Sequence, residues 1–426
     1  MACRAETKRV RRMALKDLIR HSPQRRAFLK TLVAGTAAAF VPTGAPSPPA
    51  APSQTSAADR IRKNGMNYRR LGRTGLHISE IALGGSPLPD ERLLVQLIER
   101  GVNYIDTSDS YENGNCERKV GRLFKEFGRD KLFIHARFHL QGRWTEAGII
   151  ASVEGSLRRL ATDYTDILGI HGVENPDHLT DERILGAFDK LKAQGKYRFR
   201  GLTCHLNQHT VIPKAVASGL YDMVQIGYNV FDLQETEKDI KTYSDYLGES
   251  GIGKLIELAH GRGLGITAMK VLKVGGRRQD LAGAKAAGSS LYQAMIKWAL
   301  GNEKLSAVVI EIMNDQEMEE DLGATGQGLT GAEKRLLYTH VAANSRAACH
   351  SCGLCQEACP AGMPTADISR CLTYLESYGK EARAREQFAA LGYERSACRD
   401  CGACERACPY GVPVRDRTRR AAALFG

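Results

Sequence analysis

Eight cysteines near the carboxyl end of the chain stand in two copies of one pattern, C-x₂-C-x₂-C-x₃-C-P, at 349–360 and 398–409. Three thiolates separated by two residues each suit a loop that reaches successive corners of a cube, and this spacing is typical of proteins that hold [4Fe–4S] clusters. The pattern predicts two such clusters as cofactors, bound by eight ligands: Cys349, Cys352, Cys355, Cys359, Cys398, Cys401, Cys404 and Cys408.

The fourth cysteine of each copy precedes a proline, so the chain leaves the loop in a new direction there. In two-cluster ferredoxins such a cysteine often ligates the other cluster, and we therefore expect Cys408 to join the first copy and Cys359 the second. Structural zinc favours two separated C-x₂-C pairs, and disulfides among such crowded thiols would be poorly determined, so both alternatives explain the pattern less well. Because these clusters relay single electrons, the pattern indicates redox chemistry.

The formal net charge of +12 is concentrated at the amino end of the 426 residues. Residues 1–30 hold ten lysines and arginines against two acids, a local charge of +8 that leaves only +4 for the remainder. A nearly balanced body gives no reason to predict a nucleic-acid partner. With 43% hydrophobic residues, the chain has the composition of a soluble globular protein that is long enough for two or three domains.

Residues 1–65 resemble an export signal followed by a linker. Arg25-Arg26 precedes a weakly apolar run at 31–41 and a Pro/Ala/Ser-rich stretch at 42–58, which is similar to a twin-arginine signal. That route carries folded cargo, which suits clusters assembled in the cytosol. About 15 mostly apolar residues are short for the roughly 20 that span a bilayer, so we expect no stable transmembrane span. We predict a periplasmic or membrane-associated protein; a disordered basic arm for nucleic acid or anionic lipid is the alternative.

From residue 66 onward, short apolar segments alternate with segments of helical periodicity. Eight strand-plus-helix units in about 260 residues match the size of a (β/α)₈ TIM barrel, an α/β fold that we predict for residues 66–325. A doubly wound open sheet would favour G-x-G-x-x-G after its first strand, and the sequence has none there. The predicted strands are 81–83, 104–105, 132–134, 167–170, 199–202, 223–226, 265–269 and 307–310.

In such a barrel, chemistry takes place at the carboxyl ends of the strands. Polar or ionisable residues follow most of the predicted strands: Asp106, Arg137, His171, Thr203, Tyr228, Asn229 and Lys270. One or two such residues could simply be polar side chains where a strand leaves the core. The whole set is poorly explained in that way. His205 and His209 have i, i+4 spacing without an acidic partner, so we interpret them as surface or helix-cap histidines. The polar stretch 232–250 is interpreted as a loop that forms a lid.

Several segments together resemble the aldo-keto reductases: 68–85, 106–111, 157–171, 195–201, 225–229 and 265–270. In that family a tyrosine protonates a carbonyl oxygen while hydride arrives from a nicotinamide. The resemblance implies that Tyr111 is this acid, that Asp106 and Arg137 lower its pKa, and that His171 orients the carbonyl. A phenol with a pKa near ~10 is a poor catalyst at neutral pH without a neighbouring cation.

Three positions depart from the family pattern. Arg137 stands where the family has lysine; arginine keeps the charge but cannot give up its proton, so we expect an altered reaction centre. Glu311-Ile312 replaces a Pro-Gly pair near the dinucleotide phosphates and opposes their close approach. Thr203-Cys204 replaces a Ser-Asn pair on the nicotinamide side. The resemblance implies NADP(H) as a cofactor, bound by five residues: Thr203, Cys204, Gln225, Tyr228 and Lys270.

Beyond the barrel, residues 326–348 have the helical pattern of a connector. Residues 349–426 form the predicted ferredoxin-like iron–sulfur domain, which is small and mainly helical. Two helices are predicted between the cysteine runs, at 367–378 and 380–391.

These features together predict an exported iron–sulfur oxidoreductase of aldo-keto reductase type. It would interconvert a small carbonyl or alcohol substrate at Tyr111 and transfer electrons through two clusters, with a redox protein as a partner. The alternative is an electron carrier or partner-binding protein whose barrel has lost NADPH-dependent catalysis, which Arg137 and Glu311-Ile312 favour. The joint presence of Asp106, Tyr111 and His171 favours the enzyme.

Overall fold

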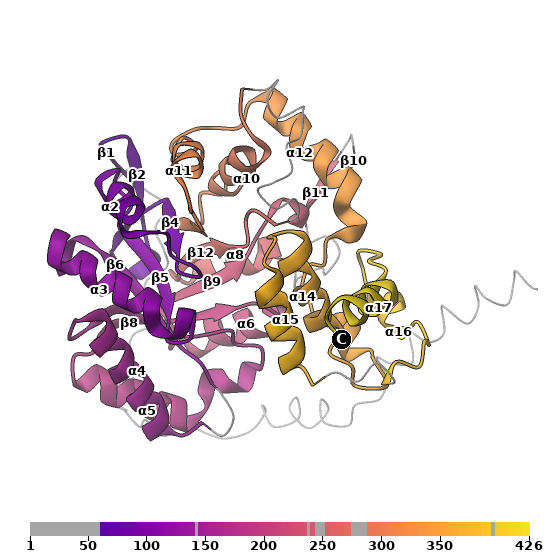
Figure 1. Cartoon of the computed structure of the whole chain (residues 1–426), viewed down its shortest axis with the longest axis horizontal. Coiled ribbons are helices and arrows are strands. Elements are labelled where there is room, and N and C mark those ends of the chain that lie inside the picture. The colour runs from indigo at the N-terminus through magenta and orange to yellow at the C-terminus, as the bar shows by residue number, and fades with distance from the viewer. Residues whose placement is uncertain (1–59, 141–143, 237–238, 243–251, 274–287, 393–396) are drawn as a thin grey trace, which may run out of the picture. The chain divides into compact units, whose positions relative to one another are not determined.

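Eight parallel strands close into a barrel in the computed structural model of the chain (Figure 1). Pairing runs from β12 through β13 and β4 to β9, and β9 pairs with β12 to close the ring. The predicted (β/α)₈ fold is therefore confirmed, and each predicted strand overlaps an observed one. The strands are β4 (Ile81–Gly84), β5 (Tyr104–Ser108), β6 (Phe133–Phe138), β7 (Thr165–Ile170), β8 (Tyr197–Cys204), β9 (Met223–Gly227), β12 (Gly265–Met269) and β13 (Ala307–Ile310).

The structure describes residues 60–140, 144–236, 239–242, 252–273, 288–392 and 397–426. The predicted export signal lies outside these residues, as does most of the predicted lid. The described part of the lid is a hairpin of β10 (Leu233–Thr236) and β11 (Asp239–Thr242). Among the described helices, none combines the length and the apolar character that a membrane crossing requires.

Helices cover the outside of the barrel, and several begin at a capping side chain. Asp90, Thr145 and Asp181 each accept a backbone N–H of the first helical turn, a contact worth about 1 kcal/mol. Their inward-facing apolar residues join the outer faces of the strands in one large core. The helices are α2 (Glu91–Glu99), α3 (Asn115–Phe127), α4 (Glu146–Leu160), α5 (Glu182–Ala193), α6 (Gln208–Ser218), α8 (Ile252–Gly261), α10 (Leu291–Leu300) and α11 (Asp315–Leu322).

A small antiparallel sheet closes the amino end of the barrel. Leu71 and Ile78 pack against Tyr104 at the first residue of β5. Gly72 has φ +49°, and a Cβ there would lie 2.2 Å from the nitrogen of Gly265, so this approach requires glycine. The amino end is filled by apolar side chains, which leaves the carboxyl end for a site. The sheet contains β1 (Arg60–Lys63), β2 (Met66–Arg70) and β3 (His77–Ser79).

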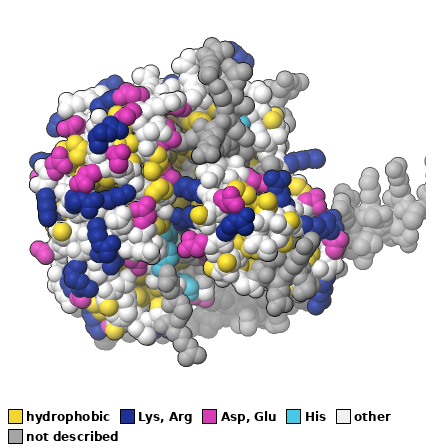
Figure 2. Space-filling view, viewed as in Figure 1, with side chains coloured by type: hydrophobic (Ala, Val, Ile, Leu, Met, Phe, Trp, Pro, Cys, Tyr) yellow, Lys and Arg dark blue, Asp and Glu magenta, His cyan; other side chains and the backbone are white. Residues whose placement is uncertain are grey.

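The carboxyl-terminal region is helical and belongs to one compact unit with the barrel. Ile368, Leu372 and Phe388 form its own small core, and Leu337 packs into the barrel core. The predicted helices between the cysteine runs correspond to α14 and α15. On the face shown in Figure 2, basic and acidic side chains are interspersed. The helices are α12 (Gly331–Asn344), α13 (Leu354–Glu357), α14 (Thr365–Glu376), α15 (Glu381–Ala390), α16 (Ala403–Ala407) and α17 (Val414–Phe425).

Candidate active site

Asp106, Arg137 and Tyr111 form one hydrogen-bonded unit at the carboxyl ends of β5 and β6. The Arg137 Nη2 atom donates to Asp106 Oδ2 at 2.6 Å and to the Tyr111 hydroxyl at 2.7 Å. Arg137 is only 1% exposed and Asp106 only 3%. Because a buried charge is costly unless it is paired and hydrogen-bonded, each of these two charges stabilises the other. The change from lysine to arginine therefore preserves an ion pair beside the tyrosine.

Burial controls the proton affinities of this unit. It raises the pKa of Asp106, and Arg137 and the Gln225 amide, 3.2 Å from Asp106 Oδ2, oppose that rise. Burial also raises the pKa of Tyr111, because desolvation outweighs the nearby positive charge of Arg137. As the resemblance implied, Arg137 lowers the pKa of Tyr111, but Asp106 raises it and burial raises it further, so the net shift is upward. The phenol is a neutral proton donor that is hydrogen-bonded to a cation.

His171 lies next to Tyr111, and two further histidines lie beside His171. The His171 ring meets the Tyr111 ring edge-on at 5.5 Å, and its Nδ1 lies 2.9 Å from Ser108 Oγ. Burial lowers the pKa of His171 well below its usual value, so the imidazole is neutral. His139, which sequence reasoning missed, lies with its ring 3.8 Å from that of His171. It directly follows β6, so the rule that site residues follow strands could have found it.

His205 is not the surface or cap residue that was predicted. Its ring lies 5.7 Å from that of His171, and it lines the cavity above Tyr111. The prediction was wrong because His205 immediately follows β8 and precedes α6, so it faces the mouth of the barrel.

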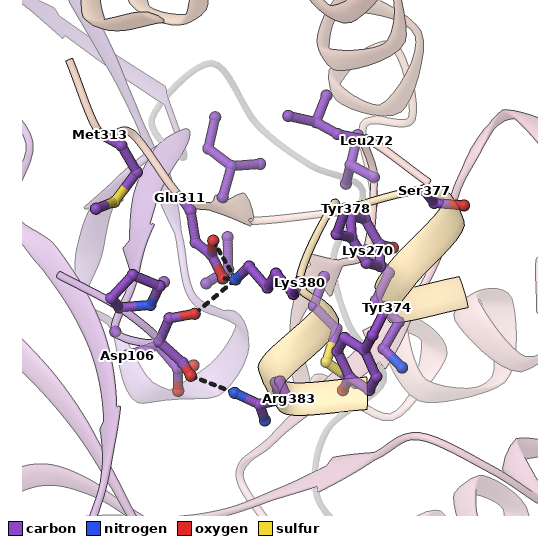
Figure 3. Close-up of a pocket in the computed structure, with 18 of the residues that line it drawn as sticks. Asp106, Lys270, Leu272, Glu311, Met313, Tyr374, Ser377, Tyr378, Lys380 and Arg383 are labelled. Atoms are coloured by element: carbon purple, nitrogen blue, oxygen red, sulfur yellow. Dashed lines mark hydrogen bonds and ion pairs between the residues drawn. The ribbon is translucent and has the colours of Figure 1, made fainter. Parts of the chain in front are cut away.

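A cavity of about 590 Å³ lies over this unit, between the barrel mouth and the segment that joins α14 to α15 (Figure 3). Lys380 donates to the Ser86 carbonyl at 2.8 Å and pairs with Glu311, and Arg383 donates to Ser86 Oγ. Sequence reasoning missed Lys380 and Arg383, because helices between two cysteine runs give no signal of what they cover. The cavity wall contains barrel residues and helical residues: Asp106, Tyr111, Arg137, Gln225, Lys270, Tyr374, Lys380 and Arg383.

The five residues predicted to bind NADP(H) do not come together. Gln225 and Lys270 line the cavity, but Thr203, Cys204 and Tyr228 are not among the residues that line it.

The other three side chains are engaged within the barrel. Thr203 Oγ1 accepts the Gly172 N–H at 2.8 Å, and Cys204 Sγ donates to the Leu206 carbonyl at 2.9 Å. The Tyr228 ring stacks on Trp298 at 4.6 Å. Glu311, which was expected to oppose a phosphate, is paired with Lys380. Of the five residues that the resemblance implied for the nicotinamide, only Gln225 and Lys270 therefore line this cavity.

The eight predicted cluster ligands lie in two groups of four. Cys359, Cys398, Cys401 and Cys404 line one small cavity. In each group, three cysteines come from one C-x₂-C-x₂-C-x₃-C-P run and the fourth comes from the other run. This is the exchange of the fourth cysteine, Cys359 or Cys408, that the sequence predicts. The second group contains Cys349, Cys352, Cys355 and Cys408, whose thiols influence one another.

The spread of these thiols fits a cluster better than a single zinc ion. Burial raises the pKa of Cys352 and of Cys355 to about 12, and neighbouring thiols of the group add to the rise. Among the described residues, no three His, Cys, Asp or Glu side chains are close enough to hold a single metal ion. A zinc ion needs four sulfurs at ~2.3 Å from one point, whereas a [4Fe–4S] cluster spreads four thiolates over its corners.

Comparison with known proteins agrees with both parts of the chain. Residues 87–333 match the aldo/keto reductase family, and residues 348–413 match a 4Fe-4S dicluster domain. The chain belongs to the aldo/keto reductase family. It is an oxidoreductase that carries a second, iron–sulfur domain after the barrel.

Individual relatives cover mainly the barrel. L-galactose dehydrogenase of Arabidopsis thaliana is 26% identical over 61% of this chain and 88% of its own length. The uncharacterized oxidoreductase YqkF of Bacillus subtilis is 32% identical over 40% of this chain and 59% of its own. A solved aldo-keto reductase from Klebsiella pneumoniae, in complex with NADPH, has a TM-score of 0.51 at 21% identity and covers 64% of this chain and 93% of that one. At this identity the structural likeness shows the fold alone.

Proposed function

We propose that this aldo/keto reductase interconverts a small carbonyl compound and its alcohol, and that it exchanges the electrons through two [4Fe–4S] clusters. The observation that carries the proposal is a single cavity lined by both domains, with Tyr111 and Arg137 from the barrel and Tyr374 and Arg383 from the iron–sulfur domain. Forming the alcohol consumes two electrons and two protons: two bound clusters would each carry one electron, Tyr111 would supply the proton on oxygen, and the proton on carbon would come from solvent in the cavity.

The protein groups at Tyr111 support proton transfer at the substrate oxygen. Tyr111 donates its proton to the oxygen as the alcohol forms, and Arg137 stabilises the phenolate that remains. Asp106 holds the guanidinium in place, and neutral His171 orients the carbonyl. Because arginine keeps its proton, the phenolate recovers one from solvent in the cavity.

We assign no hydride transfer from NADP(H), because three of the five predicted residues do not line the cavity. A redox protein that donates single electrons is the reductant we propose instead. It would act at the cysteine group of Cys398, Cys401, Cys404 and Cys359, because Cys401 is exposed whereas Cys355 of the other group is buried.

The test uses anaerobically reconstituted full-length protein. Its clusters are reduced with dithionite, excess reductant is removed, and small aldehydes and oxo acids are added while visible absorbance and electron paramagnetic resonance are followed. Cluster oxidation in step with alcohol formation supports the proposal, and Tyr111→Phe should retain the clusters but not react. Clusters that remain reduced with every substrate would contradict it and favour the electron carrier, which the altered positions Arg137 and Glu311 also favour.

We also propose export through the twin-arginine pathway, supported by the arrangement of Arg25-Arg26 and the apolar run at 31–41. Replacing both arginines by lysine keeps the charge and should hold the protein in the cytoplasm. Cell fractionation measures this, and unchanged export of the double variant would overturn the proposal.

A further inference from the structure

Two cations of the cavity wall have no carboxylate as an ion-pair partner among the residues that the structure describes. The charged residues of this wall are four cations, Arg137, Lys270, Lys380 and Arg383, and four acids, Asp106, Glu311, Glu317 and Glu376. Asp106 pairs with Arg137, and Glu311 pairs with Lys380. Two cations and two acids therefore remain to be matched.

The two remaining acids have other partners. Glu376 pairs with Arg417 and Arg420 of α17, each at 3.1 Å. Glu317 accepts the backbone N–H of Met313 at 2.8 Å. Neither acid neutralises Lys270 or Arg383.

Lys270 and Arg383 flank one phenol within the cavity (Figure 3). In the part of the chain that the structure describes, no carboxylate forms an ion pair with either side chain within 4.0 Å. The Tyr374 ring lies 5.7 Å from Lys270 Nζ and 5.1 Å from Arg383 Cζ. Burial lowers the pKa of Lys270 to about 8, and the nearby Arg370 and Arg383 add to this effect. Partly buried cations without a carboxylate partner are less favourable than paired ones, and an anionic ligand would supply the missing partner.

The backbone at Lys270 is also strained. Its φ of +60° lies in the left-handed region, which a residue with a side chain rarely adopts. Such strain persists where the surrounding structure enforces it, and it concentrates at ligand sites. Lys270 directly follows β12, so the strained turn places its ammonium at the mouth of the barrel.

We propose that Lys270 and Arg383 together bind the carboxylate of the substrate, so that the substrates are small oxo acids and hydroxy acids. This rests on the proposed function and names its substrate class. A guanidinium can grip a carboxylate with two parallel hydrogen bonds, and an ammonium adds a compact charge. Arg383 Cζ lies 5.8 Å from the Tyr111 ring, which places the bound carboxylate close to the proton donor.

A dinucleotide phosphate fits these cations less well than a substrate carboxylate. The family resemblance places the phosphates near the residues that follow β13. In this chain that position holds Glu311, whose carboxylate is paired with Lys380. A phosphate there would meet a negative side chain and would have to break an ion pair.

The test is calorimetric titration of reconstituted full-length protein with pyruvate, 2-oxohexanoate and phenylpyruvate, each compared with its neutral amide. We expect at least one acid to bind about tenfold or more tightly than its amide, because hydrogen bonds to charged groups are strong. Lys270→Met and Arg383→Gln should each remove most of this preference, and the double variant all of it. Arg385→Gln is the matched control, since Arg385 is exposed on the same helix and pairs with Glu381.

Equal binding of every acid and its amide would overturn the proposal, as would a preference that survives in the double variant while circular dichroism shows a folded protein. NADPH binding that the same two variants abolish, without preference for the acids, would assign the cations to dinucleotide phosphates instead. If oxo acids bind as expected but leave reduced clusters unchanged, the carboxylate site stands and the proposed function fails. If clusters are oxidised by aldehydes while acids and amides bind alike, the function stands and the carboxylate site fails.

Discussion

The two walls of the cavity are built in opposite ways. On the barrel side, Asp106, Arg137 and Tyr111 are buried on or beside adjacent strands, and their charges cancel. On the helical side, Lys380 pairs with the Glu311 carboxylate of the barrel, whereas Arg383 donates to the Ser86 hydroxyl, and among the described residues no carboxylate forms an ion pair with it. The hydrogen-bonded unit at Tyr111 lies entirely within the barrel, whereas the helical wall contacts the barrel through Lys380 and Arg383. The barrel therefore supplies the proton donor of the cavity, and the added domain supplies part of its wall.

Removing Arg137, the cation of the barrel wall, should have the largest effect on stability and turnover. Arg137→Met leaves the buried Asp106 uncompensated, so we expect a loss of about 3–5 kcal/mol in the free energy of unfolding, together with loss of turnover. Urea denaturation measures the first quantity. Arg137→Lys, which keeps a charge, should recover much of the stability. A loss below about 1 kcal/mol in the methionine variant would show that Asp106 does not need its partner.

Removing only the proton donor, Tyr111, should lower turnover strongly and change the stability of the fold only slightly. Tyr111→Phe should lower turnover by about 10²–10⁴-fold, since it deletes the general acid, and destabilise the fold by only about 1 kcal/mol. Steady-state kinetics and thermal unfolding check the two parts. Tyr228→Phe is the control, because that ring stacks on Trp298 and is not part of the cavity lining. Comparable turnover in both variants would place the chemistry elsewhere.

Breaking the Lys380–Glu311 ion pair, which joins the helical wall to the barrel, should have a smaller effect on stability. The Lys380 and Glu311 side chains are 24% and 33% exposed, so their pairing is expected to contribute about 1 kcal/mol or less. A double-mutant cycle with Lys380→Met and Glu311→Gln measures the coupling, and hydrogen exchange should show faster opening of α15 in each variant. Exchange that stays unchanged would mean that other contacts hold this helix to the barrel.

The smallest expected effect is the change in oxo-acid affinity with pH. Burial lowers the pKa of Lys270 to about 8, and the nearby Glu174 is engaged with Arg370 at 3.1 Å. Lys270 loses its charge as the pH rises through that value, so oxo-acid affinity should weaken several-fold above pH ~8. Between pH ~8 and ~10.4 the unfolded lysine binds more protons than the folded one, so this residue's contribution to stability rises with pH. Calorimetry at several pH values checks the affinity, and the profile of Lys270→Met should be flat across this range.

Much of the barrel could be predicted because its signals are local. Apolar runs and helical periodicity report which residues are buried, so the predicted strands 104–105 and 265–269 fall within β5 and β12. Asp106, Arg137 and Lys270 could be identified because they stand at the ends of predicted strands. Parallel strands bring their carboxyl ends together, so these residues meet at the mouth of the barrel. The nicotinamide residues Thr203 and Tyr228 were not brought into the cavity, because side-chain direction at a strand end depends on packing partners such as Trp298.

By itself, the sequence determined the eight-unit barrel and the two cysteine runs, because each follows from spacing along the chain, whereas the association of Asp106 with Arg137 was implied by the family resemblance. Only the tertiary structure decided that α14 and α15 cover the barrel mouth and that Arg383 lies near Tyr111. The physical reason is that the packing of these helices on the barrel depends on complementary shape and charge between distant residues. Arg383 and Tyr111, for example, are separated by some 270 residues of chain, and no local sequence pattern shows that they will meet.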